Sequence, residues 1–225
     1  MKIAIVNKGK YSSVDLKKEL KKSGFKIVNK NPDIVFSVGG DGTFFISERK
    51  SPGIPKVLVR DSKTSKLCTN EPSKTILKKI KNKDYKIEKL IKLQARNLIA
   101  VNDIIIRNKN QYEALRFNLK INNKKYKNEF IGDGIIISTP YGSSGYFSSI
   151  TKKCFKEGNI GIAFNNSTCP VNPIIVKDNS VIEMKINRNV AIVSADNKHK
   201  TITLRPKSKI KIKKSNNCAL VIKLN

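Results

Sequence analysis

Over the first ninety residues, short apolar runs alternate with amphipathic stretches. Two amphipathic stretches predict helices, one from Ser12 or Ser13 to about Lys22 with Gly24 as its stop, the other over residues 72–80. Strands that alternate with helices are typical of a parallel sheet, so residues 1–90 are expected to form an α/β domain of Rossmann-like type. The apolar runs that predict its strands are residues 3–6, 25–28, 34–38 and 56–60.

The pattern changes near Asp84, where polar and apolar residues begin to alternate with a period of two. Asn122-Asn123 suits a two-residue hairpin turn between two such runs. Residues 91–225 are therefore expected to form a β-rich domain of antiparallel strands, with the run 219–224 possible as a strand of the first domain. The strand-like runs are residues 85–93, 98–106, 115–121, 135–138, 181–186, 191–194, 201–204 and 210–213.

A glycine turn follows the buried run 34–38 and surrounds one carboxylate, Asp41, with Gly39, Gly40 and Gly42. Glycines permit positive φ and let backbone N–H groups approach a phosphate closely. A helix expected over residues 44–50 would add partial positive charge at the carboxyl edge of the sheet, where ligands of such sheets bind. The chemical alternatives for Asp41 are proton acceptance from an attacking hydroxyl and Mg²⁺ binding, and the structural alternative is a tight connection.

Three motifs resemble those of one enzyme family. Gly39-Gly-Asp-Gly-Thr43 resembles the signature shared by NAD kinases, diacylglycerol and sphingosine lipid kinases and, more loosely, phosphofructokinases. Asp133-Gly-Ile-Ile-Ile-Ser-Thr-Pro-Tyr-Gly-Ser-Ser-Gly-Tyr146 resembles the NAD kinase signature, and Ala100-Val-Asn-Asp103 resembles that family's Asn-Glu pair. The order and spacing of all three fit the NAD kinases, whose fold is an α/β domain followed by a β-rich domain.

This resemblance implies transfer of a terminal phosphoryl group to the adenosine ribose 2′-hydroxyl of NAD, which gives NADP. Asp41 would be the catalytic base or would orient that hydroxyl. The implied donor is ATP or polyphosphate, with Mg²⁺ or another divalent cation delivered with the ATP, and the implied assembly is a homo-oligomer, a dimer or a tetramer. The residues implied in NAD binding are Gly42, Asn102, Asp103, Asp133, Ser144, Gly145, Tyr146, Ser149 and Asp196.

Some of these positions have structural alternatives, and some depart from the family pattern. Asn102-Asp103 could be a turn that interrupts two strands, and Tyr146 could be a core tyrosine. Gly145 replaces the usual Ala, and Asp103 is one methylene shorter than the usual Glu. The loop 59–67 lacks the glycines that the family shows there, and the segment 169–173 is a shortened version of a longer one.

Charge supports a competing hypothesis, a basic nucleic-acid-binding protein. The 46 Lys and Arg against 17 acids give a formal net charge of +29. The lysines are spread through every segment, however, and few aromatic residues are available for stacking. We interpret the charge as a compositional bias and expect no specific nucleic acid partner. A lipid kinase is a second alternative, opposed by the segment 133–146 and by the lack of an apolar stripe for a lipid tail.

The four cysteines show no C-x-x-C and no zinc spacing. The chain has one histidine, His199, so a Ser/His or Cys/His hydrolase is excluded unless His199 is its catalytic histidine. His199 lies in a turn that is expected to be solvated. The sequence shows neither the charged and then apolar pattern of a secretory signal peptide nor an apolar run of about twenty residues that could span a membrane. We therefore expect a cytoplasmic protein with reduced thiols and no membrane partner.

Overall fold

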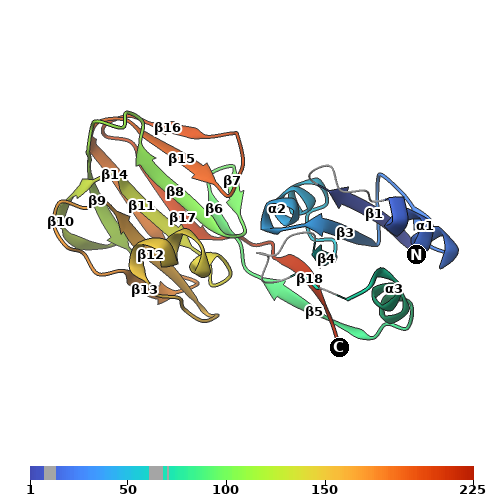
Figure 1. The fold of residues 1–225 in the computed structure, drawn as a ribbon. Coiled ribbons are helices and arrows are strands. Elements are labelled where there is room, and N and C mark those ends of the chain that lie inside the picture. Colours follow the sequence, from blue (N-terminus) through green and yellow to red (C-terminus); the bar gives the residue numbers. More distant parts are fainter. Residues whose placement is uncertain (8–13, 61–67, 70) are drawn as a thin grey trace. The chain divides into compact units, whose positions relative to one another are not determined.

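The structure, a computed structural model, describes residues 1–7, 14–60, 68–69 and 71–225 (Figure 1). The chain divides into two compact units. The first contains Met1–Leu90 together with Cys218–Asn225, and the second contains Ile91–Asn217. Every helix in the described part of the chain is too short or too polar to cross a membrane.

The first unit contains a six-stranded sheet in the order β2-β1-β3-β4-β18-β5. All of its neighbouring pairs are parallel except β18 and β5, which are antiparallel. Its strands are β1 (Lys2–Asn7), β2 (Lys26–Ile27), β3 (Ile34–Gly39), β4 (Lys56–Arg60), β5 (Tyr85–Leu90) and β18 (Ala219–Leu224), and its helices are α1 (Val14–Lys22), α2 (Asp41–Lys50) and α3 (Ser73–Lys81).

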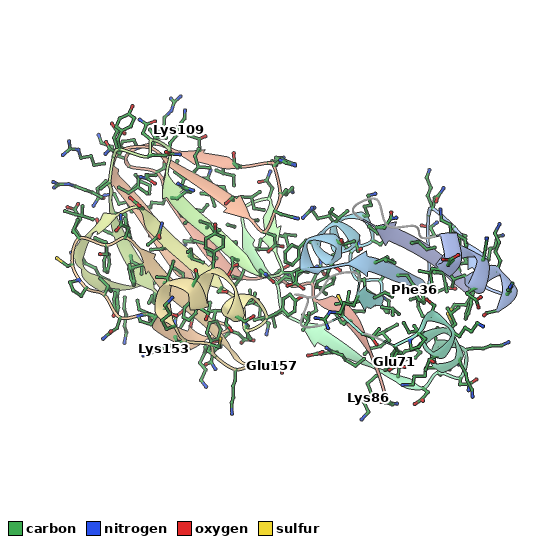
Figure 2. All side chains as sticks on the ribbon, in the orientation of Figure 1. Phe36, Glu71, Lys86, Lys109, Lys153 and Glu157 are labelled. Atoms are coloured by element: carbon green, nitrogen blue, oxygen red, sulfur yellow. The ribbon has the colours of Figure 1, made fainter. Side chains whose placement is uncertain are left out.

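Alternate residues of the central strand β3 face two separate cores. Phe36, which is fully buried and labelled in Figure 2, packs in the core that α1 and α3 share with the sheet. Val35 packs in the opposite core, where Ile46 of α2 contacts it. Because the sheet is covered on both faces, β3 is apolar on both sides, as is usual for a strand in a parallel sheet.

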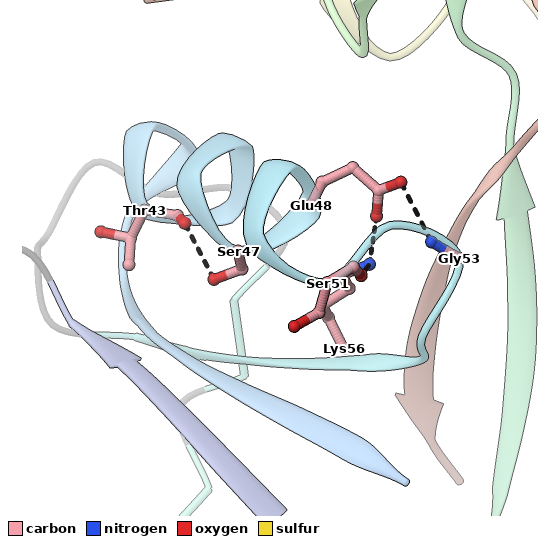
Figure 3. A network of polar contacts seen from close by, with 6 residues as sticks. All are labelled: Thr43, Ser47, Glu48, Ser51, Gly53 and Lys56. Carbon is pink, nitrogen blue, oxygen red and sulfur yellow. Dashed lines mark hydrogen bonds and ion pairs between the residues drawn. The ribbon is translucent and has the colours of Figure 1, made fainter. Parts of the chain in front are cut away.

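A buried ion pair joins the C-terminal half of α2 to β4 (Figure 3). Lys56 has no exposed surface, and its Nζ donates to the Glu48 carboxylate and, at 2.7 Å, to the Ser51 carbonyl. The other oxygen of Glu48 accepts from the Gly53 N–H at 3.3 Å. The pair therefore closes the short loop between α2 and β4 and fixes the helix against the sheet.

The second unit contains two six-stranded sheets, in the orders β10-β9-β14-β17-β6-β7 and β13-β12-β11-β8-β15-β16. Every paired neighbour in them is antiparallel. The strands are β6 (Leu93–Ala95), β7 (Leu98–Ala100), β8 (Asp103–Asn108), β9 (Leu115–Ile121), β10 (Lys124–Gly132), β11 (Gly134–Ser138), β12 (Asn159–Asn165), β13 (Ile174–Lys177), β14 (Ile182–Arg188), β15 (Ala191–Ala195), β16 (Ile202–Leu204) and β17 (Lys209–Lys214).

One apolar core lies between these two sheets, with residues such as Phe117 from the first sheet and Ile137 from the second. A short helical segment covers the outer face of β11 and β12, where Phe147 packs on Ile136 and Ala163. It consists of the 3₁₀ helix η1 (Gly142–Ser144) and the helix α4 (Tyr146–Thr151). The second unit is therefore a β-sandwich with one helical cover.

Several elements differ from those predicted. Helix α2 begins at Asp41 and not at Phe44, because Gly40 takes the N-cap position. The run 98–106 splits into β7 and β8, and the run 85–93 splits into β5 and β6. The strands β10 and β12 were not predicted, because polar or glycine residues interrupt their alternation, and the four-residue strand β13 was also not predicted. The hairpin at Asn122-Asn123 joins β9 to β10, with φ of 49° and 66° as a type I′ turn requires.

Replacing Lys56 by Met should lower the free energy of unfolding by about 3–5 kcal/mol, because Glu48 is left charged and buried without its partner. The double variant Glu48→Gln/Lys56→Met should lose clearly less, since a neutral amide still accepts from the Gly53 N–H. Urea unfolding of the three proteins measures this difference. Equal losses for the single and double variants would show that packing, and not charge, governs the site.

Candidate active site

The first unit has one candidate site, the glycine turn after β3. Gly39 has φ of +146°, and a Cβ built on it would lie 2.3 Å from Thr43 Oγ1, so glycine is required there for two separate reasons. The Cys68 thiol donates to the Gly39 carbonyl at 3.3 Å. The turn therefore has a fixed backbone conformation at the carboxyl end of β3.

Asp41 is the first residue of α2, and its side chain is exposed. The N-cap residue Gly40 has no side chain with which to cap the helix, and its carbonyl accepts from the Thr43 N–H at 2.9 Å. An acid in the first turn stabilises a helix by about 0.3–1 kcal/mol, which is a structural reason for Asp41. The same helix terminus favours phosphate, so Asp41 lies beside a region where a nucleotide phosphate is stabilised.

The second unit has a candidate site of its own, the turn between β7 and β8, which Asp196 stabilises. The carboxylate of Asp196 accepts from three successive backbone N–H groups, those of Val101 at 2.8 Å, Asn102 at 2.8 Å and Asp103 at 3.2 Å. Asp196 itself has a left-handed backbone with φ of 46°, and its N–H donates to the Asp103 carbonyl at 3.0 Å. The sequence favoured a binding pair at Asn102-Asp103 over a turn between two strands, whereas the structure has a turn at Val101 and Asn102, with Asp103 as the first residue of β8.

Two residues of the segment 133–146 fasten the other side of this turn. Thr139 donates its hydroxyl to the Val101 carbonyl at 2.6 Å, and its N–H donates to the Asn102 carbonyl at 2.8 Å. Gly142 packs directly on Asn102, since a Cβ on it would lie 2.6 Å from the Asn102 carbonyl oxygen. The side-chain oxygen of Asn102 is buried and has no hydrogen-bond partner in the described part of the chain. The turn is therefore rigid and retains one unpaired acceptor.

Asp103 is 5% exposed, and Ser138 donates its hydroxyl to the Asp103 carboxyl. Burial raises the pKa of Asp103 from 3.8 to about 7, the Ser138 hydrogen bond lowers it, and the nearby Asp196 carboxylate raises it. Near neutral pH this carboxyl group therefore exists in both protonation states. It can donate a hydrogen bond when protonated and accept one when ionised.

The start of α4 presents four predicted NAD-binding residues together on the surface. Ser144, Gly145, Tyr146 and Ser149 are all exposed, and Tyr146 is 61% exposed, so it is not a core tyrosine. Phe147, which lies between them in sequence, is fully buried and meets Phe155 edge-to-face with ring centroids 5.0 Å apart. This anchor holds the helix start in place while its polar residues remain accessible.

Asp133 lies away from this group. It precedes β11, whereas Ser138 at the other end of β11 pairs with Asp103, so the two acids are about 17 Å apart at the rise of an antiparallel strand. Asn108 and Asn166 donate side-chain N–H groups to the two oxygens of Asp133, at 3.3 Å and 3.2 Å. Asp133 is thus oriented by two amides, at a separate end of the same strand.

Sequence reasoning gave no role to Ser138 and Thr139, although both lie in the segment that carries the resemblance. Their roles depend on pairing with residues about 35 positions earlier, for which the sequence has no signal. The loop 59–67 lies largely outside the described residues. Segment 169–173 is described and mostly exposed. His199 is exposed, as expected, and all four cysteines are free.

Comparison with known proteins assigns this arrangement to a family. Residues 101–224 match the family model described as the ATP-NAD kinase C-terminal domain. The NAD kinase of Sulfurisphaera tokodaii is 30% identical over 212 residues, which cover 86% of this chain and 84% of that protein. The chain belongs to the NAD kinase family. The bifunctional NADP phosphatase/NAD kinase of Methanocaldococcus jannaschii is 28% identical over 68% of this chain and 29% of its own length.

Two solved structures share the NAD kinase fold with this chain. An NAD kinase from Archaeoglobus fulgidus in complex with ATP matches with a TM-score of 0.88 at 22% identity, over 100% of this chain and 94% of that one. Yeast NADH kinase complexed with NADH matches with a TM-score of 0.83 at 13% identity, over 100% of this chain and 83% of that one. At these identities the likeness concerns the fold.

Replacing Gly142 by Ala should weaken NAD binding at least about tenfold and lower the unfolding free energy by about 1–3 kcal/mol, because the new methyl group meets the Asn102 backbone. Calorimetric titration with NAD and thermal unfolding measure the two effects. Gly145→Ala is the matched control for the unfolding free energy, since its Cβ meets only the Gly142 carbonyl oxygen at 3.3 Å and its φ of −94° suits alanine. Similar losses of stability in both variants would contradict the proposed contact.

Stability should fall as pH rises from about 4 to about 7, because over this range Asp103 is ionised in the unfolded chain and protonated in the folded one. Below that range Asp103 is protonated in both the folded and the unfolded chain, and its contribution to stability is fully present. Relative to Asp103→Asn, the wild-type chain should lose on the order of 4 kcal/mol across this window. Urea unfolding at pH 4.5 to 8 tests this, and parallel pH profiles for the two proteins would contradict it.

Proposed function

We propose that this chain phosphorylates the adenosine ribose 2′-hydroxyl of NAD to give NADP, with ATP or polyphosphate as donor. The observation that carries the proposal is the position of Asp41, an exposed acid in the first turn of α2, directly after a glycine turn with a fixed backbone. The family to which the chain belongs supports the reaction. The family model also covers the segment 133–146, which opposes the lipid kinase alternative.

In the proposed reaction the 2′-oxygen attacks the terminal phosphorus of the donor, and the bond to the bridging oxygen breaks. With ATP, ADP leaves with the electron pair of that bond. Asp41 orients the hydroxyl and accepts its proton, which then passes to solvent. Gly42 and the N–H groups at the start of α2 lie toward the phosphates, where the partial positive charge of the helix end stabilises them.

A divalent cation fits this arrangement only as part of the nucleotide. The described residues contain no cluster of three or more His, Cys, Asp or Glu side chains that could hold a metal ion. Mg²⁺ that arrives on the nucleotide is held mainly by phosphate oxygens and waters, so it would leave the Asp41 carboxylate to the ribose hydroxyl. When bound, the ion would neutralise negative charge on the phosphates.

The second unit is proposed to bind the NAD. Asn102, which is partly buried, is proposed to contact the NAD together with Asp103, whose carboxyl group changes protonation near neutral pH. Tyr146, with Ser144, Gly145 and Ser149, offers an exposed ring and small neighbours suited to adenine and ribose. Asp196 was expected to contact NAD. Its contacts with three N–H groups support a positioning role, in which it sets the direction of Asn102 and Asp103.

Asp133 is proposed to bind the nicotinamide ribose or its amide, with Asn108 and Asn166 holding its carboxylate. Its separation of about 17 Å from Asp103 requires an extended ligand.

We further propose a homo-oligomer, a dimer or a tetramer, and a cytoplasmic location. For the first unit we propose a Rossmann-like nucleotide-binding role, which the parallel order of β1, β3 and β4 supports.

Replacing Asp41 by Asn should lower kcat for NADP formation by about 10²–10⁴-fold, since the amide cannot accept the proton, while NAD still binds. Tyr146→Ala is the complementary variant and should raise KM for NAD with a smaller change in kcat, because it loses only ring contacts. Purified protein incubated with NAD, Mg²⁺ and either ATP or polyphosphate supplies the assay. Turnover retained in Asp41→Asn would remove Asp41 from the base role, and no NADP with either donor would refute the function.

A further inference from the structure

The outer face of the sheet that contains β17 carries a concentration of positive charge. Alternation along β17 directs Ile210 and Ile212 into the core and leaves Lys209, Lys211 and Lys213 exposed on the other side. The helical cover of this unit packs on β11 and β12, which belong to the other sheet. The β17 face therefore lies on the opposite side of the sandwich from α4, the predicted NAD-binding helix start.

Neighbouring strands add further cations in register with β17. One row of paired residues crosses four strands of this sheet. It runs from Lys211 on β17 to Glu183 on β14, and then to Lys120 on β9 and Lys125 on β10. Like charges directly opposite each other destabilise an antiparallel pair, so Lys120 and Lys125 are not explained by sheet stability. Lys185 lies opposite Lys209. The β17 face is defined here as Arg96, Lys120, Lys125, Lys185, Lys209, Lys211 and Lys213.

This face is also hollow. A cavity of about 770 Å³ opens on it, and its walls include Arg96, Lys209, Lys211 and Lys213, with Glu183 as the acid among its lining residues. The Arg96 guanidinium donates to the Lys209 carbonyl at 3.1 Å, which holds it at the rim, and Lys211 Nζ lies 3.7 Å from the Glu183 carboxylate. The hollow thus has four cationic side chains and one acid.

We propose that the β17 face binds the phosphate backbone of a nucleic acid, without reading its sequence. Successive cations of β17 are about 6.7 Å apart, a repeat comparable to that of phosphates along a polynucleotide strand. None of the described residues that line the hollow is aromatic, so charge, and not stacking on bases, provides the affinity there. A flat anionic membrane cannot fill a hollow, and a second copy of this face is repelled by like charge.

The net charge of the whole chain is the competing explanation, and a charge-matched pair of variants separates the two. The first is Lys209→Gln/Lys211→Gln/Lys213→Gln on the β17 face. The second is Lys17→Gln/Lys18→Gln/Lys21→Gln on α1, where all three lysines are exposed. Both remove the same charge from exposed side chains. Circular dichroism and NADP formation check that each variant remains folded and active.

Fluorescence anisotropy with labelled single- and double-stranded oligonucleotides of two unrelated sequences, over a series of salt concentrations, measures binding. The β17 variant should bind at least about tenfold more weakly, and the slope of log affinity against log salt should fall by about 2 to 3. The α1 variant should bind like the wild type. Glu183→Gln, which removes the acid of the hollow, should bind more tightly.

Equal weakening in the two lysine variants would assign the binding to net charge and overturn the proposal. Tighter binding of the wild type to phosphatidylserine vesicles than to the oligonucleotides would assign the face to a membrane and also overturn it. Strong dependence on base sequence would refute recognition through phosphates alone. Loss of NADP formation is not expected in any of these variants, so the result is independent of the proposed kinase function.

Discussion

The contact between the Asp196 carboxylate and three successive backbone N–H groups is the interaction on which the candidate NAD site depends. Three N–H groups converge on one anion only when the backbone is bent, so the carboxylate and the turn at Val101–Asp103 determine each other. Thr139 and Gly142 then contact the other side of the same turn. The backbone positions of Asn102 and Asp103 are therefore fixed by contacts with residues from other parts of the second unit.

The glycine turn of the first unit also has a fixed backbone, but glycine conformation and close packing fix it there, and not a carboxylate. Gly39 adopts a backbone conformation that side chains disfavour and leaves room for Thr43. The buried pair of Glu48 and Lys56 fixes the other end of α2, so the helix is held at both termini. A helix held in this way presents its N-terminal N–H groups, and Asp41 with them, without reorganisation when a phosphate binds.

Local patterns predicted much of the fold, and contacts between distant residues determined the rest. The apolar run 56–60 and the alternating run 115–121 appear with the predicted bounds, since side-chain periodicity is sufficient to define them. The run 98–106 looked continuous because the residue that bends it, Asp196, lies about ninety residues later. The motifs identified Asn102, Asp103 and Asp196, but only the structure showed that Asp196 serves the other two.

The scarcity of acids in this chain explains how they are used. The chain has 46 cations against 17 carboxylates, yet hydrogen bonds from uncharged groups orient three of its acids. Asp196 accepts from backbone, Asp133 accepts from two asparagines, and Asp103 accepts from a serine. Neutral donors orient a carboxylate without cancelling its charge. The Asp133 carboxylate therefore keeps a negative potential that a hydroxyl or amide of a ligand can meet, whereas Asp103, with its pKa raised to about 7 by burial, is only partly ionised near neutral pH.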